Sequence, residues 1–172
     1  MLIEETLGMQ NIEEIAASTP RLEAMIFGMG DYSASQGLDF TAMFGPDYRY
    51  PGDVFHYAKF RVAMAARARG IDAIDGPFAS IGNLEAYRES CLQARALGMV
   101  GKWALHPPQI EHAQQIFTPD QSRIVEARKM TTAYEESLAE GRGAVMIDGK
   151  FADAATVRHM ANVLDLADLY GL

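Results

Sequence analysis

The chain has 172 residues, of which 49% are hydrophobic and 22% are charged, and its formal net charge is −8. This composition is typical of one soluble globular domain with enough apolar side chains for a core, and it excludes an intrinsically disordered chain. The acidic balance argues against a nucleic-acid-binding protein, because such proteins need clustered lysine and arginine.

No stretch of the sequence approaches the ~20 consecutive apolar residues of a membrane span. The N-terminal residues show no signal-peptide pattern, so we expect a cytoplasmic protein that does not bind membranes. The single cysteine, Cys91, lies on an apolar helical stripe and is expected to have a buried packing role.

Short apolar segments bounded by glycine, proline or charge predict four buried strands, at residues 1–4, 24–28, 71–74 and 100–105. Helical patterns lie between and after these strands. The strands therefore alternate with helices, which predicts a parallel α/β sheet, either open or closed into a barrel.

The helices are predicted from apolar residues at helical spacing and from capping residues at their starts. Asn11 and Glu14 have the spacing of a capping box. The later helices are expected to present these faces: Tyr57, Phe60, Met64 and Ala68; Leu84, Tyr87, Cys91 and Ala94 behind the cap Asn83; Ile124, Ala127, Tyr134 and Leu138 in a helix that starts at Thr118-Pro119; and Val157, Met160, Leu164 and Ala167 behind the cap Asp153.

Polar residues follow the four predicted strands. Sites in parallel sheets lie at the carboxyl ends of the strands, so we expect Glu4, Asp31, Asp75 and His106 to emerge on the same side. Two carboxylates at neighbouring strand ends repel unless a cation lies between them, and Mg²⁺ is commonly held by one or two carboxylates. Glu4 and Asp31 are therefore candidate metal ligands.

Each of these residues also has an ordinary structural explanation. Asp31 could cap a helix that starts at Tyr32, and Glu4 could be a solvated strand end. Asp75 precedes a glycine, which favours a role in shaping the turn. His106 either contacts an anionic ligand or is tethered to the backbone. Lys102 is left unassigned, because an enzyme with a metal site has no need of a Schiff-base lysine.

Several stretches, in order, carry a family resemblance: "LIEETLGMQNIEEIAASTPRLEAMIFGMGDYSAS", "GIDAIDGPF", "GKWALHPPQI" and "GRGAVMIDGKFADAA". Together they resemble the citrate lyase β-subunit and malyl-CoA lyase family of acyl-CoA aldolases. The stretch "PGDVFHYAKFRVAMAARARGIDAIDGPF" is most similar to the malyl-CoA/β-methylmalyl-CoA lyases. The resemblance implies a TIM barrel that uses Mg²⁺ to make or break a carbon–carbon bond between a 2-oxo acid and an acyl-CoA.

The resemblance also implies roles for individual residues. Glu4, in "LIEE", and Asp31, in "GMGD", match the metal ligands of the family, for Mg²⁺ with Mn²⁺ as an alternative. Asp148, in "VMIDGK", matches a catalytic aspartate that reaches the active site of a neighbouring subunit, which implies a homo-oligomer. A plain hairpin turn at Asp148 is the alternative. The backbone amides of Met29 and Gly30 are expected to contact substrate.

Coenzyme A is expected as part of the substrate, and no residue is assigned to bind it. The predicted partners are an acyl-CoA and a 2-oxo acid of the glyoxylate type. The long loop at residues 36–52 is expected at the ligand or at a subunit interface, through its aromatic residues Phe40, Phe44, Tyr48 and Tyr50.

The length departs from the family pattern, because a TIM barrel has eight strands and typically ~250 residues. The fold predicted here is therefore the C-terminal half of a TIM barrel. Residues 1–140 would form a half-barrel catalytic domain with four parallel strands, and residues 141–172 a helical lid segment of the same domain. A lone half would expose two strand edges and should pair with itself or aggregate.

The predicted function is that of a Mg²⁺-dependent acyl-CoA lyase, present as a fragment. It would cleave L-malyl-CoA or β-methylmalyl-CoA to glyoxylate and acetyl-CoA or propionyl-CoA, or catalyse the reverse condensation. The alternatives are a malyl-CoA thioesterase, a citrate lyase β-like lyase, and, in a different class, an inactive half-barrel remnant or assembly partner.

Overall fold

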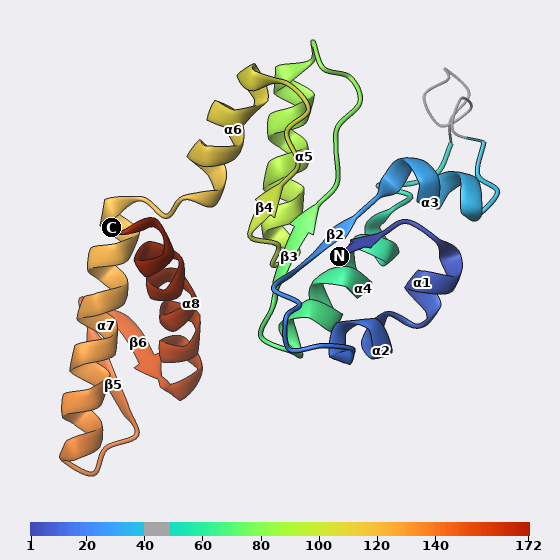
Figure 1. Cartoon of the computed structure of the whole chain (residues 1–172). Coiled ribbons are helices and arrows are strands. Elements are labelled where there is room, and N and C mark those ends of the chain that lie inside the picture. Colours follow the sequence, from blue (N-terminus) through green and yellow to red (C-terminus); the bar gives the residue numbers. More distant parts are fainter. Residues whose placement is uncertain (40–48) are drawn as a thin grey trace. The chain divides into compact units, whose positions relative to one another are not determined.

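A computed structural model describes residues 1–39 and 49–172 of the chain (Figure 1). The chain divides into two compact units, Met1–Phe117 and Thr118–Leu172, called unit 1 and unit 2 below. Three of the four predicted loop aromatics, Phe40, Phe44 and Tyr48, lie outside the described residues. No helix in the described ranges is both long and apolar enough to cross a membrane.

Unit 1 is an α/β unit built on a four-stranded parallel sheet with the order β1-β2-β3-β4. Its elements are, in chain order, β1 (Leu2–Ile3), α1 (Thr6–Gln10), α2 (Ile12–Ala17), β2 (Ala24–Phe27), α3 (Met29–Ser35), α4 (His56–Arg67), β3 (Asp72–Asp75), α5 (Leu84–Ala96), β4 (Gly101–Lys102) and α6 (Pro107–Phe117). The predicted parallel sheet is confirmed, and its strands have the predicted order along the chain.

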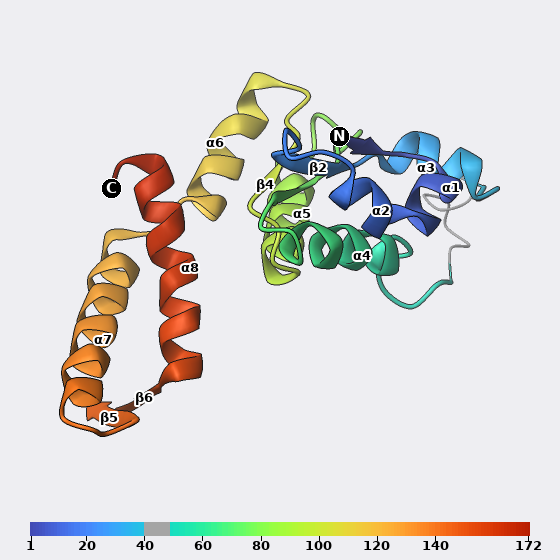
Figure 2. The same cartoon turned by 60° about the horizontal axis from the view of Figure 1, so that its bottom comes forward.

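The two faces of the sheet differ in burial. Helices α4 and α5 pack against β2, β3 and β4 (Figure 2). The strand side chains on this face are 0 to 4% exposed: Ile3, Met25, Phe27, Ala73 and Asp75. The alternate residues along the same strands are only partly buried: Leu2, Ile26 and Ile74. Successive side chains of a strand point to opposite faces. The sheet therefore has a helix-covered face and a second, more open face.

The face predicted for helix α4 is the wrong one. Tyr57, Phe60 and Met64 are 65%, 47% and 49% exposed, whereas Val62 and Ala66 on the other side of the helix are fully buried. The buried side of α4 consists mainly of alanines, whose small side chains allow the helix to lie close to the strands. Size was therefore a poor guide to burial in this helix.

Two of the predicted helix caps are confirmed. Asn83 and Asp153 each accept a hydrogen bond from the backbone N–H three residues further on, at 3.1 and 2.9 Å. Asn11, by contrast, makes no capping hydrogen bond through its side chain and separates α1 from α2. The long helix α7 begins at Gln121 instead of Thr118-Pro119, because the carboxylate of Asp120 caps it.

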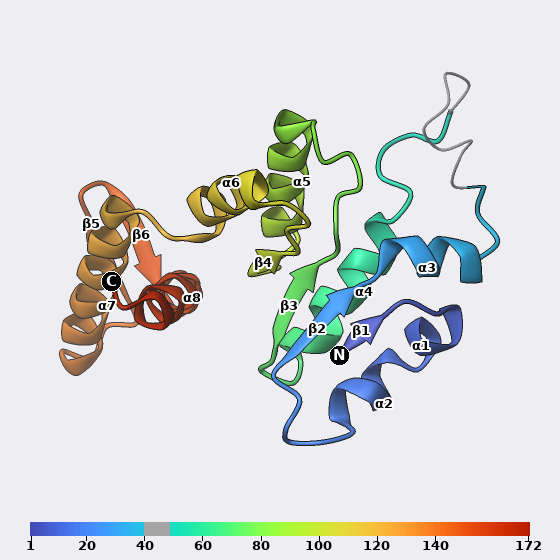
Figure 3. The ribbon, with the colours of Figure 1, turned by 45° about the horizontal axis from the view of Figure 1, so that its top comes forward.

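Unit 2 consists of α7 (Gln121–Ala139), an antiparallel hairpin of β5 (Ala144–Ile147) and β6 (Lys150–Asp153), and α8 (Ala154–Tyr170) (Figure 3). Its most buried side chains include Ile124, Ala127, Ala152 and Ala167. Leu138, which was predicted to point inward, is 55% exposed. The predicted division between residues 140 and 141 falls within unit 2, where α7 contacts α8 and β5. The catalytic and lid roles of residues 1–140 and 141–172 stay predictions.

Candidate functional site

Glu4 and Gly28 lie side by side at the carboxyl ends of β1 and β2. The pairing of Ile3 with Phe27 places them next to each other, and the N–H of Gly28 donates to the carbonyl oxygen of Ile3 at 2.8 Å. A Cβ atom at residue 28 would lie 2.7 Å from Cβ and 3.0 Å from Oε2 of Glu4. The absence of a side chain at Gly28 therefore leaves the space that the Glu4 carboxylate occupies.

Asp31 lies in the first turn of α3, about one helical turn beyond Gly28. The helix begins at Met29 with Gly28 as its N-cap, so the alternative in which Asp31 caps a helix starting at Tyr32 is wrong. The Asp31 side chain is exposed. A carboxylate in the first turn of a helix is favoured by the partial positive charge of the helix N-terminus.

The donor set of Glu4 and Asp31 fits magnesium. Both offer carboxylate oxygens, and Mg²⁺ is usually held by one or two carboxylates while it keeps water or substrate oxygens as its other ligands. In residues 1–39 and 49–172, no group of three or more His, Cys, Asp or Glu side chains forms a metal cage. Two carboxylates alone would leave most coordination positions of such a cation to water or substrate oxygens.

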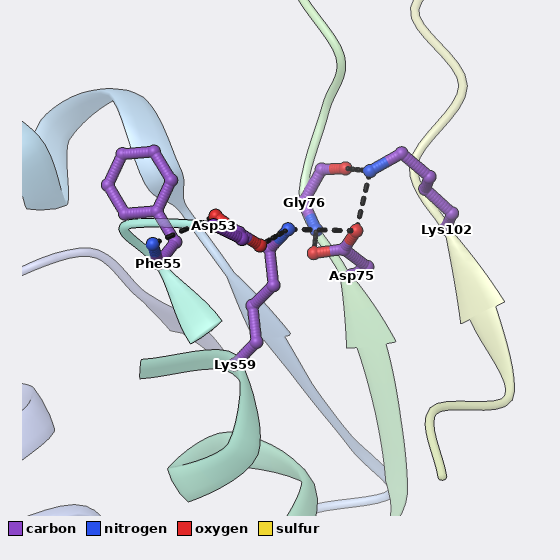
Figure 4. A network of polar contacts seen from close by, with 6 residues as sticks. All are labelled: Asp53, Phe55, Lys59, Asp75, Gly76 and Lys102. Carbon is purple, nitrogen blue, oxygen red and sulfur yellow. Dashed lines mark hydrogen bonds and ion pairs between the residues drawn. The ribbon is translucent and has the colours of Figure 1, made fainter. Parts of the chain in front are cut away.

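Asp75 lies on the other face of the sheet, among buried charges (Figure 4). Its Oδ1 accepts the N–H of Gly76 at 2.9 Å, which confirms the predicted role in shaping the turn. Its Oδ2 lies 2.6 Å from Nζ of Lys102 and 3.9 Å from Nζ of Lys59. The side chains of Asp75 and Lys102 are 1% exposed. Asp75 thus lies at the carboxyl end of β3, as predicted, with its side chain pointing toward the helices.

Burial dominates the electrostatics around Lys102. Burial lowers the pKa of its ammonium group, while the neighbouring Asp75 carboxylate opposes that shift. The Lys102 Nζ lies 5.9 Å from the ring centre of Tyr87, whose pKa is raised by burial. Cys91 is fully buried, as predicted, and burial raises the pKa of its thiol. The sequence did not predict this ion pair, because Asp75 and Lys102 lie 27 residues apart in the chain.

Two other residues near the strand ends have simpler surroundings. His106 is exposed, and its backbone N–H donates to the side chain of Gln109 at 3.3 Å.

Met29 lines a pocket of about 520 Å³ together with Phe55, Lys59 and Phe78. This pocket could not be read from the sequence, because its lining comes from four separate segments.

Asp148 lies in unit 2, at the tip of the β5–β6 hairpin. Asp148 and Gly149 have φ angles of 49° and 75°, which are typical of the two-residue type I′ turn. The Asp148 Oδ2 accepts a hydrogen bond from Nζ of Lys129 at 2.5 Å, and this bond lowers the pKa of the carboxyl group. Lys150 forms a second ion pair, with Glu126 of α7. Asp148 therefore combines a hairpin-turn position with an exposed, ionised carboxylate.

Residues 1–107 match the family model of the HpcH/HpaI aldolase/citrate lyase proteins. The chain belongs to the HpcH/HpaI aldolase/citrate lyase family. The resemblance seen in the sequence is thereby confirmed, and Glu4 and Asp31 both lie within the matched residues.

Two curated proteins illustrate how this chain is related to lyases and thioesterases. The L-malyl-CoA/β-methylmalyl-CoA lyase of Rhodobacter capsulatus is 36% identical over 98% of this chain and 56% of its own length. The (3S)-malyl-CoA thioesterase of Cereibacter sphaeroides is 32% identical over 88% of this chain and 50% of its own. The chain therefore spans about half the length of the curated relatives that it matches.

A solved structure of the protein CitE from Mycobacterium tuberculosis, in complex with magnesium, acetoacetate and coenzyme A, is also similar. It is 27% identical, with a TM-score of 0.73, over 97% of this chain and 60% of that chain. That protein binds a magnesium ion and coenzyme A, and its similarity supports the α/β fold of this chain.

Proposed function

We propose that this chain is the C-terminal half of a Mg²⁺-dependent acyl-CoA lyase that acts on L-malyl-CoA or β-methylmalyl-CoA. The observation that carries the proposal is the Glu4 carboxylate held over Gly28, with Asp31 one helical turn further on. The identity to the Rhodobacter capsulatus lyase supports the substrate class. The magnesium-bound relative supports the metal.

The more open face of the sheet supports the proposal of a half-barrel. All-parallel sheets are normally covered on both faces, yet Leu2, Ile26 and Ile74 are only partly buried. In a closed barrel these side chains would point into a packed interior. We propose that four further strand–helix units cover this face, which agrees with the roughly twofold length of the relatives.

The proposed chemistry assigns a task to each candidate residue. Glu4 and Asp31 would hold the metal, and Mg²⁺, or Mn²⁺ in its place, supplies Lewis-acid polarisation of the oxygens of the glyoxylate portion. Met29 and Gly30 lie in the first turn of α3, where backbone N–H groups have no partner within the helix, and would donate hydrogen bonds to substrate. Asp148 would transfer the proton at the acyl-CoA α-carbon.

Proton transfer by Asp148 requires that its carboxylate reach an active site. In the proposal a homo-oligomer brings the β5–β6 hairpin over the active site of a neighbouring subunit. Burial there would raise the pKa of Asp148 above the lowered value that Lys129 imposes on the exposed carboxylate. A cytoplasmic location, predicted from the sequence, accompanies this proposal.

The test is glyoxylate release from malyl-CoA, measured with and without Mg²⁺. The chain is assayed alone and after co-expression with the N-terminal half of the Rhodobacter capsulatus lyase. We expect Mg²⁺-dependent glyoxylate from the co-expressed pair and none from its Asp148→Asn variant. A stable, folded pair that releases neither glyoxylate nor free coenzyme A from malyl-CoA, and cleaves no citryl thioester, would favour the inactive remnant or assembly partner instead.

A thioesterase is the second candidate, favoured by the 32% identity to the malyl-CoA thioesterase. Hydrolysis would release free coenzyme A thiol and malate without glyoxylate, so measuring the thiol and glyoxylate in one reaction separates the two activities. A citrate lyase β-like reaction is the third candidate. It would release a different 2-oxo acid from a citryl thioester and leave malyl-CoA uncleaved.

A further inference from the structure

Gly76, directly after β3, packs against the end of β2. A Cβ atom at residue 76 would lie 2.0 Å from the carbonyl oxygen of Phe27 and 3.7 Å from the backbone nitrogen of Met29. Any side chain at this position would therefore push the two strand ends apart. The Gly76 backbone is thus in direct contact with the end of β2, just before the segment from Gly28 to Asp31.

The Gly76 residue is itself held from two sides. Its N–H donates to Oδ1 of Asp75 at 2.9 Å, and its carbonyl oxygen accepts a hydrogen bond from Nζ of Lys102 at 2.9 Å. Lys102 also donates to Oδ2 of Asp75 at 2.6 Å, which closes the arrangement. Both side chains are 1% exposed, so water does not compete for these bonds.

The same cluster continues to the start of α4 (Figure 4). Lys59 lies 3.9 Å from Asp75 and donates to Oδ2 of Asp53 at 2.8 Å, and Oδ1 of Asp53 accepts the N–H of Phe55. The cluster contains two carboxylates and two ammonium groups, so its charges balance. Because buried charges need such partners, loss of a single member would leave the charge of its partner uncompensated.

We propose that Asp75 and Lys102 are positioning residues for the segment that carries Asp31. They hold Gly76 against Phe27 and so place the exit of β2, although they lie on the opposite face of the sheet from Glu4. The inference rests on the proposed role of Asp31 as a Mg²⁺ ligand. In this role Asp75 and Lys102 would contact neither the metal nor the substrate.

The test uses the double variant Asp75→Asn/Lys102→Met in the full chain. Removal of one partner of a buried ion pair leaves an uncompensated charge, whereas replacement of both is tolerated far better. The new amide at position 75 retains an acceptor for the N–H of Gly76, while the thioether at position 102 offers no donor to its carbonyl oxygen. The matched control is Ile12→Val, which reduces packing in the unit 1 core at helix α2.

Two measurements are made on each protein. Hydrogen exchange is followed in the metal-free protein at two backbone amides. The N–H of Gly28 donates to the carbonyl oxygen of Ile3, and the N–H of Tyr32 donates to the carbonyl oxygen of Gly28. Calorimetric titration with Mg²⁺ gives the dissociation constant. We expect faster exchange at both amides in the double variant and affinity about tenfold weaker than wild type, in the range seen for supporting residues of metal sites. Ile12→Val should change neither quantity.

The outcomes separate this inference from the proposed function. A folded double variant with wild-type hydrogen exchange at Gly28 and Tyr32 overturns the positioning role, regardless of its measured Mg²⁺ affinity. A wild-type chain that binds no Mg²⁺, with exchange accelerated in the double variant, contradicts the metal site and retains the positioning of the segment.

Discussion

The Glu4 side chain occupies the volume that a side chain at Gly28 would fill, with Oε2 only 3.0 Å from the position of an added Cβ atom. The two residues come from neighbouring strands, 24 positions apart in the sequence, and meet because of the parallel register of β1 and β2. The glycine at this strand end therefore leaves room for the Glu4 carboxylate.

Gly28→Ala should weaken Mg²⁺ binding about tenfold, since the new methyl group displaces the Glu4 carboxylate. Gly30→Ala is the matched control, because an added Cβ at residue 30 meets no atom within 4 Å. Calorimetric titration of both variants with Mg²⁺ tests the prediction. Equal affinities in the two variants would contradict the placement of Glu4 at the metal.

Asp31→Asn should weaken Mg²⁺ binding by more than about 100-fold, because it removes one of the two proposed charged ligands, and even supporting residues contribute 10–100-fold. Asp72→Asn makes the same chemical change at the opposite end of the sheet, where β3 begins. It should leave the affinity unchanged. The same loss in both variants would point to a general effect of negative charge instead of a site.

Lys129→Gln should raise the pKa of Asp148 toward its ordinary value, since the Lys129 hydrogen bond is the main cause of the lowered value. Carboxyl ¹³C chemical shifts followed through a pH titration measure it directly. Glu126→Gln is the control, because it breaks the neighbouring ion pair with Lys150 and leaves the Lys129 bond intact.

The Lys129–Asp148 pair also predicts a pH dependence. Because the pKa of Asp148 is lowered in the folded chain, the pair stabilises the hairpin at neutral pH. That stabilisation is lost as the pH falls through the lowered pKa. The effect should be small, since both side chains are more than half exposed. Hydrogen exchange of the β5–β6 amides across acidic pH measures it.

Asp148→Asn and Asp148→Ala should differ in the folding of the hairpin. Asparagine tolerates the positive φ of residue 148, whereas alanine is strained there. We expect protected β5–β6 amides in the Asn variant and faster exchange in the Ala variant. In the co-expressed lyase both should lose turnover, which separates the carboxylate from the turn. Turnover in the Asn variant would contradict a catalytic role for Asp148.

The sheet and the carboxylate positions could be predicted because they depend on local patterns. Short apolar runs marked the strands, and the residues that follow them had to lie at one edge of a parallel sheet. The face of α4 could not be predicted in this way. Its alanines are buried and its Tyr57 is exposed. Which residues are buried depends on how closely the helix approaches the sheet, and the residue pattern of one helix does not contain that distance.

The buried cluster shows a second limit of local patterns. Asp75 was expected to form a turn, and it does, but its partners Lys59 and Lys102 come from α4 and β4. An isolated lysine in a sequence reads as a surface residue. Only the register of β3 and β4, with Asp75 opposite Lys102, shows that a strand-end carboxylate neutralises it.

Trp103 gives unit 1 an optical signal of its own. It is the only tryptophan of the chain, and its backbone N–H donates to the carbonyl oxygen of Asp75 at 2.9 Å. Its side chain is 42% exposed, next to the buried Lys102. Indole emission shifts to shorter wavelength when water is excluded. A polypeptide that covers this part of the sheet would therefore be visible as a blue shift, without any label and without interference from unit 2.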